Sequence, residues 1–403
     1  MSFSQAMRLW PVRVIFAALA VLALLALQNA LGRTMNPYNY SILVLAGISV
    51  ILAVSLNLIN GITGQFSLGH AGFMAIGAYT SASFTYYAGP GIIARSQNAE
   101  VGTAFVFFIA LLIAAFFAGI AGLLVGMPSL RLRGDYLAIV TLGFGQIIIT
   151  IIRTIKEVGD ASGFTNLPKM TTLAWVYGAA ILCIFCVRNI ADSAIGRSMR
   201  AVREDEIAAE AAGIDTTKIK VLAFVIGSMW AGVAGALQAH YLQLASPDMF
   251  TFYKSIEIVV MVVLGGLGSI TGAAIAAVLL RFLEESLRDV GPALAAGIGL
   301  AVLAAILSRP RHRAAIQAGP LGTIRWLMWP VLSIIGMLLV YRYGQGWMQS
   351  NVSALRYIIY ASILIVLMLL RPQGLLGRGE FGWHLFKKRQ NQNENSANGQ
   401  NAA

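Results

Sequence analysis

A succession of long apolar runs is the feature that most constrains the fold of this 403-residue chain. Hydrophobic residues make up 58% of it and charged residues 11%, whereas soluble domains carry about 25% charged residues. Each run has about the 20 residues that a helix needs to cross a bilayer. Backbone groups cannot stay unpaired in hydrocarbon, so these runs should be helices. The candidate spans are residues 13–32, 40–60, 68–88, 103–126, 135–153, 173–190, 219–244, 290–307, 325–343 and 353–370.

One further apolar stretch, residues 255–283, is interrupted by Gly265, Gly266 and Gly268. If it crossed the membrane once, the basic loop Ser308–Arg313 would fall on the non-cytoplasmic side. If it enters and returns on one face, most of the 29 Lys and Arg residues become cytoplasmic, which is the usual bias. We therefore predict an all-α polytopic membrane protein with about ten transmembrane helices, one re-entrant Gly-broken segment and both termini in the cytoplasm.

Polar segments are short in this chain. We assign residues 1–388 to one transmembrane domain with a cytoplasmic loop at 191–218, and we expect the Asn/Gln-rich tail 389–403 to be disordered. The two cysteines, Cys183 and Cys186, have a CxxC spacing, which can indicate redox or zinc chemistry. They lie inside an apolar run without a second ligand pair, so we interpret them as buried packing residues.

The charged, alanine-rich insert that begins at Glu204 is the most unusual polar segment. Asp205 and Glu206 fall in the first turn of a predicted short helix, where negative charge complements the helix dipole. Gly213 is a plausible end of this helix, since glycine adopts the left-handed conformation at low cost. Asp215 can then cap the next membrane helix. The sequence thus predicts a short helix between two spans on the cytoplasmic face.

This predicted helix has one apolar stripe, formed by Ile207, Ala211 and Ile214. One interpretation is a helix that lies on lipid, but such helices usually carry Lys and Arg on their polar face. The acidic, small-sided character here favours a groove on a soluble protein partner. The residues that we expect to make this contact are Arg203, Glu204, Asp205, Glu206, Glu210, Ala211, Ala212 and Gly213.

Polar and glycine residues also interrupt two membrane segments, at residues 61–77 and 265–272. Glycine lets helices pack closely, and it also lets a helix break and expose its ends to a polar solute. Both interpretations remain open for the glycines. Polar side chains at membrane depth usually face the bundle interior or a cavity. The candidate lining residues of a polar path are Gln65, Ser67, His70, Gly265, Gly266 and Gly268.

The sequence contains no recognisable catalytic or nucleotide-binding motif. His70 and His240 have no third metal ligand nearby, and the nucleophile and zinc motifs G-x-S-x-G and H-E-x-x-H are absent. A phosphate-binding loop needs G-x-x-x-x-G-K-[ST], whereas GGLGSITG at 265–272 has no lysine. We therefore expect a protein that is not an enzyme and has no catalytic residues, bound metal or cofactor of its own.

Five separated segments resemble one known family in their content and order. Together they resemble the branched-chain amino-acid ABC permease family, and within it the M-type (LivM-like) subunit. The similarity runs from about Asn57 to Gly272 and resumes near the C-terminus. The segments are Asn57–Ala82, Arg131–Ile148, Arg200–Phe224, Ala239–Gly272 and Leu369–Gly377.

This resemblance implies a subunit of an importer in the bacterial inner membrane. Its partners would be a second, H-type (LivH-like) permease, two cytoplasmic ATPase subunits that hydrolyse ATP, and a periplasmic solute-binding protein. The segment Arg200–Phe224 would be the loop that couples it to the ATPases. The implied solute is a branched-chain or other hydrophobic amino acid. Alternatives are a urea, short-amide or sugar permease of the same kind, and an autonomous secondary transporter, which would need an intramembrane ion site.

Overall fold

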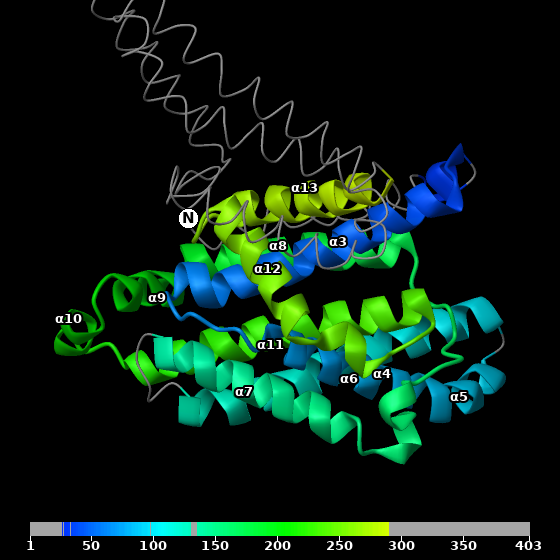
Figure 1. The fold of residues 1–403 in the computed structure, drawn as a ribbon, viewed down its shortest axis with the longest axis horizontal. Helices are drawn as coiled ribbons and strands as arrows, with labels where there is room; N and C mark the ends of the chain where they lie inside the picture. The colour runs from blue at the N-terminus through cyan, green and yellow to red at the C-terminus, as the bar shows by residue number, and fades with distance from the viewer. Residues whose placement is uncertain (1–25, 27, 33, 97, 130–134, 290–403) are drawn as a thin grey trace, which may run out of the picture.

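The computed structural model describes residues 26–289, apart from residues 27, 33, 97 and 130–134. Every regular element in this part of the chain is a helix, and the long helices run side by side in one bundle (Figure 1). The main helices are α3 (Pro37–Asn57), α4 (His70–Tyr87), α5 (Gly89–Arg95), α6 (Ala99–Ser129), α7 (Asp135–Ile152), α8 (Leu173–Asp192), α9 (Ala194–Glu204), α10 (Glu206–Ala211), α11 (Thr216–Leu242), α12 (Phe252–Gly265) and α13 (Ile270–Asp289). Four short helical turns complete them: η1 (Leu58–Ile62), η2 (Lys156–Val158), η3 (Asp160–Ser162) and η4 (Pro247–Phe250).

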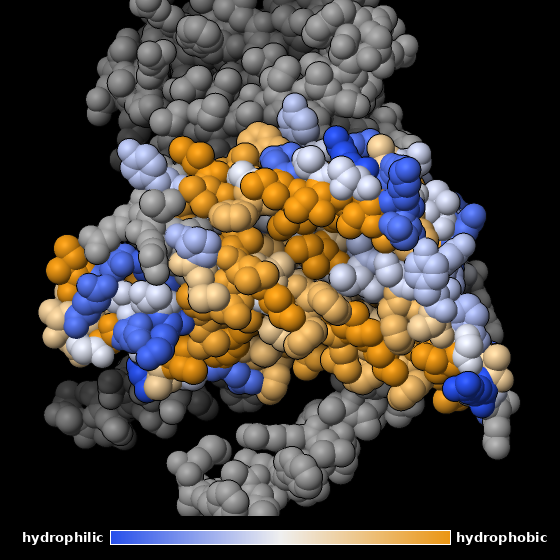
Figure 2. Space-filling model, turned by 90° about the horizontal axis from the view of Figure 1, so that it is seen from below, coloured by the Kyte–Doolittle hydropathy of each residue, from blue (hydrophilic) through white to orange (hydrophobic). Residues whose placement is uncertain are grey.

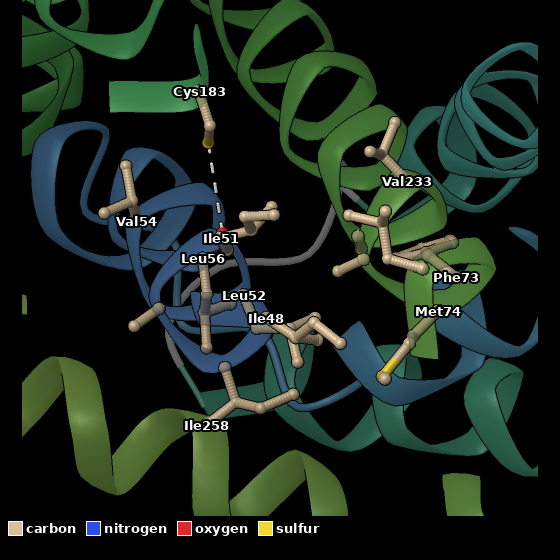
Figure 3. Packing of buried hydrophobic residues seen from close by; sticks show 14 of the residues in the cluster. Ile48, Ile51, Leu52, Val54, Leu56, Phe73, Met74, Cys183, Val233 and Ile258 are labelled. Carbon is tan, nitrogen blue, oxygen red and sulfur yellow. Dashed lines mark hydrogen bonds between the residues drawn. The ribbon is translucent and has the colours of Figure 1, made fainter. Parts of the chain in front are cut away.

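Helix α3 lies in the middle of the apolar core. Figure 3 shows its side chains among Phe73 of α4, Val233 of α11 and Ile258 of α12, three residues of one buried cluster. The thiol of Cys183 in α8 points to the carbonyl oxygen of Ile51 at 4.0 Å. Both predicted packing cysteines are free thiols; Cys183 is fully buried, as predicted, whereas Cys186 is only half-buried.

Close backbone contact joins α4 to α11. A Cβ atom added to Gly77 would lie 2.2 Å from the Cα atom of Gly232. One added to Gly235 would lie 2.0 Å from the carbonyl oxygen of Met74. No side chain fits at these distances, so the two helix backbones touch directly, as small residues permit in membrane bundles.

The outer surface of the bundle is strongly apolar. Figure 2 shows a broad hydrophobic band across one face, and α6 leaves Phe105, Leu112 and Phe116 more than half exposed. Contiguous apolar surface of this kind marks contact with a membrane or a partner. Within the described residues, four helical segments are long and apolar enough to cross a membrane, and a bent pair is a fifth if it counts as one span. They are Pro37–Ile62, Ala99–Pro128, Leu173–Asp192 and Thr216–Leu242, and the pair Tyr136–Ile152 with Lys156–Ser162, bent by 88°.

The predicted spans inside the described region agree with observed helices. The spans predicted from 40 to 60, 68 to 88, 103 to 126, 135 to 153, 173 to 190 and 219 to 244 correspond to α3, α4, α6, α7, α8 and α11. Helix α4 is less apolar than the others, because it carries Ser, Thr, Tyr and Gly residues, most of them buried against protein. Most of the first predicted span and all of 290–307, 325–343, 353–370 and the tail 389–403 lie outside the described residues.

The Gly-interrupted segment forms a helix pair that turns back on itself. Helix α12 ends at Gly265 and α13 begins at Ile270. At the turn, the Gly268 amide donates a hydrogen bond to Oδ1 of Asn57, where α3 ends, at 2.9 Å. Near the far end of α13, the Tyr38 hydroxyl at the start of α3 bonds to Glu285. Helix α13 therefore runs antiparallel along the whole of α3.

The loop before α12 lies at the same end of the bundle as the finish of α13. Asp248 in this loop forms an ion pair with Arg153, just after α7, at 2.6 Å. The Tyr87 hydroxyl at the end of α4 bonds to the Glu157 carbonyl nearby, and α4 finishes at the end of the bundle at which α3 starts (Figure 1). The segment thus begins and finishes at one end of the bundle, and its re-entrance into a membrane stays a prediction.

Candidate functional site

The loop predicted at 191–218, called the polar insert from here on, contains two short helices, α9 and α10, joined at Asp205. Its Oδ1 atom accepts hydrogen bonds from the amides of Ile207 and Ala208, at 2.9 and 3.1 Å. Asp205 is thus the N-cap of α10 rather than a residue of its first turn, where the sequence analysis placed it. A carboxylate at this position pairs two amides that would otherwise lack partners. Glu206 does lie in the first turn, as predicted.

The far end of α10 follows the predicted capping pattern. Gly213 has a φ of 83°, and its amide donates to the Glu210 carbonyl at 2.9 Å. Asp215 then caps α11 by accepting a hydrogen bond from the Lys218 amide at 3.0 Å. The Lys218 ammonium group lies 2.8 Å from Asp215, and its hydrogen bond lowers the pKa of this carboxyl.

Two acidic side chains attach α10 to the first turns of α11. Glu206 forms an ion pair with Lys220 at 2.6 Å, and the lysine side chain is only 8% exposed. Oε1 of Glu210 accepts a hydrogen bond from the Thr216 hydroxyl at 2.7 Å. In this structure Glu206 and Glu210 both hold α10 to its own chain, and the contact predicted for them with a partner stays a prediction.

The opposite side of α10 points away from the bundle. Ile207 is 66% exposed, and Ala211, Ala212 and Gly213 are exposed as well. In Figure 1 this helix projects beyond the ends of the long helices. Of the predicted apolar stripe, Ile207 and Ala211 are therefore exposed on the outside, whereas Ile214 is half-buried.

The connection from α3 to α4 is the first break in the bundle. After Asn57 the chain forms one wide helical turn, η1, and then continues in an irregular, largely extended stretch to His70. The Asn60 side chain closes this stretch: its Oδ1 accepts from the Ser67 amide at 3.1 Å and its Nδ2 donates to the Ser67 carbonyl at 3.4 Å. Non-helical backbone at membrane depth needs such internal partners.

This first break touches the second break, the turn between α12 and α13. A Cβ atom on Gly61 would lie 2.3 Å from the amide nitrogen of Gly268, so the two backbones are in direct contact. Asn57 joins them further, because its Oδ1 accepts from the same amide. Asn57 and Asn60 were not among the predicted site residues. The pattern that could have indicated them is a pair of amide side chains one helical turn apart within an apolar span.

The side chain of Arg203 connects the polar insert to the contact between the two breaks. Its Nη1 donates to the carbonyl oxygen of Gly61 at 2.8 Å, and its Nη2 donates to Glu204 at 2.8 Å. The sequence analysis grouped Arg203 with the residues that contact a partner. In this structure its side chain instead points into the chain, toward the two breaks.

The predicted lining residues of a polar path differ in their surroundings. Ser67 and His70 are fully buried. The Ser67 hydroxyl oxygen accepts a hydrogen bond from the Gly69 amide at 3.4 Å. The Ser55 hydroxyl lies 2.9 Å from Nε2 of His70, whose Nδ1 has no hydrogen-bond partner. Gln65 is 4% exposed, and neither amide atom has a hydrogen-bond partner. Gln65 therefore retains the polar groups that a solute would need.

The three glycines that were predicted to line the path have different roles in the structure. A Cβ on Gly265 would lie 2.4 Å from the carbonyl carbon of Gly272, which identifies Gly265 as a packing residue between α12 and α13. Gly266 and Gly268 have φ angles of 110° and 92° and form the turn itself. No three His, Cys, Asp or Glu side chains gather as a metal site in the part of the chain that the structure describes.

An all-helical bundle with several long apolar helices and an apolar outer surface (Figure 2) is typical of a polytopic membrane protein. The chain belongs to the family described as the permease component of branched-chain amino acid transport systems, whose model matches residues 39–308. It is a LivM-like permease subunit of an ABC importer.

Individual relatives agree with this assignment. The chain is 35% identical over 306 residues to the high-affinity branched-chain amino acid permease protein LivM of Escherichia coli, covering 67% of this chain and 68% of the relative. A probable LivM of Methanocaldococcus jannaschii is 26% identical, covering 62% and 81%. The permease protein LivH of Escherichia coli is 32% identical over 128 residues, covering 32% and 41%. No solved structure gives a significant match.

Proposed function

We propose that this chain moves branched-chain or other hydrophobic amino acids from the periplasm to the cytoplasm as one of two permease subunits. Its proposed partners are a LivH-like permease, two cytoplasmic ATPases that hydrolyse the ATP, and a periplasmic binding protein. We further propose about ten spans plus the broken segment α12–α13 in the bacterial inner membrane, with both termini in the cytoplasm. The similarity to LivM and, over a shorter region, to LivH supports this assembly.

The outward apolar stripe of α10 is the observation that best supports coupling to a soluble ATPase. Ile207, Ala208 and Ala211 are exposed on this helix, while Glu206 and Glu210 contact the first turns of α11. A force on α10 would therefore move α11 with it. Helix α11 packs against α4 through Gly232 and Gly77, so the movement would continue into the bundle.

ATP can drive this movement only if it favours one conformation over the other. We propose that closure of the ATPase pair supplies this preference at α10. The spans then rock, and the path opens alternately to the two sides. Burying a charge in hydrocarbon is costly, so a zwitterionic amino acid needs a polar path.

The irregular stretch between α3 and α4 is the best candidate for the wall of that path. Phe66 in this stretch is 40% exposed, although non-helical backbone at membrane depth must be covered by protein or line a water-filled cavity. We propose that the second permease covers this face and that the path runs between the two subunits. Gln65, with its unpaired amide, is the proposed polar contact within it.

Co-purification followed by reconstitution tests the proposal. We expect the chain to purify from native membranes with a second permease and two ATPases, and the complex with its binding protein to take up leucine only when ATP is present. Urea and ribose in parallel assays test the two alternative solutes. A chain that purifies alone and transports solute without ATP would identify a secondary transporter and contradict the proposal.

A further inference from the structure

Arg203 lies at the junction of the three polar features of this bundle. It occupies the last turn of α9, next to the proposed coupling helix α10. Its side chain is 21% exposed, so most of it is enclosed. The carbonyl that it binds, that of Gly61, lies 142 residues away in the sequence. One side chain thus connects the insert to the break between α3 and α4.

Both breaks leave space for this arginine. A Cβ on Gly64 would lie 2.5 Å from Cγ of Arg203, and a Cβ on Gly268 would lie 2.8 Å from its Nη1. The two glycines have φ angles of 76° and 92°, which L side chains rarely adopt. Glycine is therefore needed at both positions for two reasons, the backbone conformation and the room for Arg203.

The bond from Arg203 to Gly61 is of a strong kind. Carbonyl groups at the end of a helix lack partners within it and carry the negative end of the helix dipole. A guanidinium group is always charged, and hydrogen bonds with one charged partner are roughly twice as strong as neutral ones. Arg203 therefore holds the end of the η1 turn in place from outside.

Neighbouring arginines of α9 provide a comparison. Nη2 of Arg200 donates to the Ala191 carbonyl at 2.5 Å, and Nη1 of Arg197 donates to the Asp192 carbonyl at 3.4 Å. Both bonds end at the finish of α8, immediately before the insert. Arg200 and Arg197 thus stabilise the insert locally, whereas Arg203 reaches the breaks.

We propose that Arg203 is the positioning residue that transmits movement of the insert to the two helix breaks. When α9 and α10 move, the bond to Gly61 moves the end of η1, and the guanidinium group shifts against Gly268. The stretch that holds Gln65 and the turn of α12–α13 then move together. This inference rests on the proposed function, in that α10 receives the force from the ATPases.

The complete importer in liposomes, with its partner permease, ATPases and binding protein, is the system for the test. The variants are Arg203→Gln and Arg203→Lys, with Arg200→Gln as the matched control from the same helix. Leucine uptake and ATP hydrolysis are measured in the same sample. We expect Arg203→Gln to hydrolyse ATP but to transport about tenfold less leucine per ATP, the factor that corresponds to ~1.4 kcal/mol. Arg203→Lys should fall between, and Arg200→Gln, which loses contacts to the end of α8 and within α9, should match the wild type in leucine transported per ATP.

Hydrogen exchange at residues 61–69 and 264–270 gives a readout that does not depend on the solute. With a non-hydrolysable ATP analogue, exchange in these segments should change in the wild type and stay unchanged in Arg203→Gln. If the wild type shows no change, or if Arg203→Gln keeps the wild-type change, the inference is wrong. A parallel loss of uptake and ATP hydrolysis in assembled Arg203→Gln complexes would also overturn it.

A second variant covers the case in which Arg203→Gln does not assemble. Gly64→Ala places a methyl group against Cγ of Arg203 and should displace the arginine while keeping its charge. Normal uptake per ATP in this variant would count against the inference. Failure of the proposed function gives a different result, because the wild-type importer itself would then lack ATP-dependent uptake and any nucleotide-dependent exchange at α10.

Discussion

The helix core and the helix breaks both depend on glycine, but in different ways. In the core, Gly77 of α4 faces Gly232 of α11, and each lies within a regular helix. At the breaks, Gly64 and Gly268 have left-handed backbones and face the side chain of Arg203. Glycines in the core thus allow two helix backbones to touch. Glycines at the breaks allow the backbone to touch a charged side chain from another segment.

This difference predicts that core glycines matter mainly for folding and break glycines mainly for coupling to the ATPases. Contact between two helices is lost when a side chain is forced between them, so a core substitution should affect folding first. The breaks are held by a few specific hydrogen bonds to Asn57, Asn60 and Arg203. Changes there should alter how the breaks move while most of the bundle still folds. The following substitutions test that separation.

The largest effect should come from Gly77→Leu. A leucine there would have to occupy space that the α11 backbone already fills, at 2.2 Å from Cα of Gly232. Overpacking of a core costs about 1–3 kcal/mol and occasionally more, and here rigid backbone cannot yield, so we expect the upper end. Thermal unfolding in detergent measures the loss. Gly178→Leu in α8 is the control, because a Cβ there meets nothing within 4 Å. Equal destabilisation by both variants would refute the packing role.

Lys220→Met should have the next largest effect, on transport rather than on folding. It removes the cation that pairs with Glu206 and leaves that carboxylate partly enclosed, with 27% of its side chain exposed. Breaking a fully buried pair costs about 3–5 kcal/mol, and water access should reduce this cost. We expect α10 to loosen from α11 and leucine uptake per assembled complex to fall about tenfold, as a loss of ~1.4 kcal/mol would produce.

Lys218→Met is the matched control for that substitution. Lys218 also forms an ion pair, with Asp215, but its side chain is 85% exposed, and exposed pairs contribute little. Uptake should stay near the wild-type level. If the two lysine variants lose uptake equally, attachment of α10 by Glu206 is not what matters.

Gly213→Ala should have a moderate effect that isolates backbone conformation. A Cβ at Gly213 meets nothing within 4 Å, but the φ of 83° is unfavourable for alanine, at about 1–2 kcal/mol. Uptake should fall, and Gly213→Asn should recover part of it, since asparagine visits this conformation more readily. An asparagine variant no better than alanine would show that the end of α10 needs glycine for contact with the partner instead.

The sequence predicts the helices of the described region well, and the contacts between them poorly. Apolar runs set the positions of α3, α4, α6, α7, α8 and α11, and three glycines correctly indicate the break between α12 and α13. Polar side chains at membrane depth were expected to face a path, and that remains a prediction. The structure adds partners that the sequence did not indicate: Asn60 bonds to the backbone of Ser67, and Nε2 of His70 meets the Ser55 hydroxyl while its Nδ1 has no partner. Local patterns do not show such partners, because they come from other turns and helices.

The contact made by Arg203 is also one that the sequence does not predict. From sequence it is one of several charges in a polar insert, and its neighbours indicate a surface position. Its bond to Gly61 joins residues 142 positions apart, so it depends on how α9 folds back toward α3. Gly64 and Gly268 leave space for the Arg203 side chain. Many other glycines of the chain are used for helix packing, so a glycine in the sequence does not by itself indicate this contact.

The smallest effect should be the pH dependence at the start of α11. The Lys218 hydrogen bond lowers the pKa of Asp215 below its ordinary value of 3.8. A lowered carboxyl pKa stabilises the folded state above that ordinary value, and this contribution is lost as the pH falls through the lowered pKa. Asp215→Asn keeps a capping residue but removes the titration. The wild type should therefore melt slightly higher than the variant at neutral pH, and the difference should shrink as the pH falls below 3.8 and vanish below the lowered pKa. A difference in melting temperature that persists in acid would mean that Asp215 acts through its shape as a cap and not through its charge.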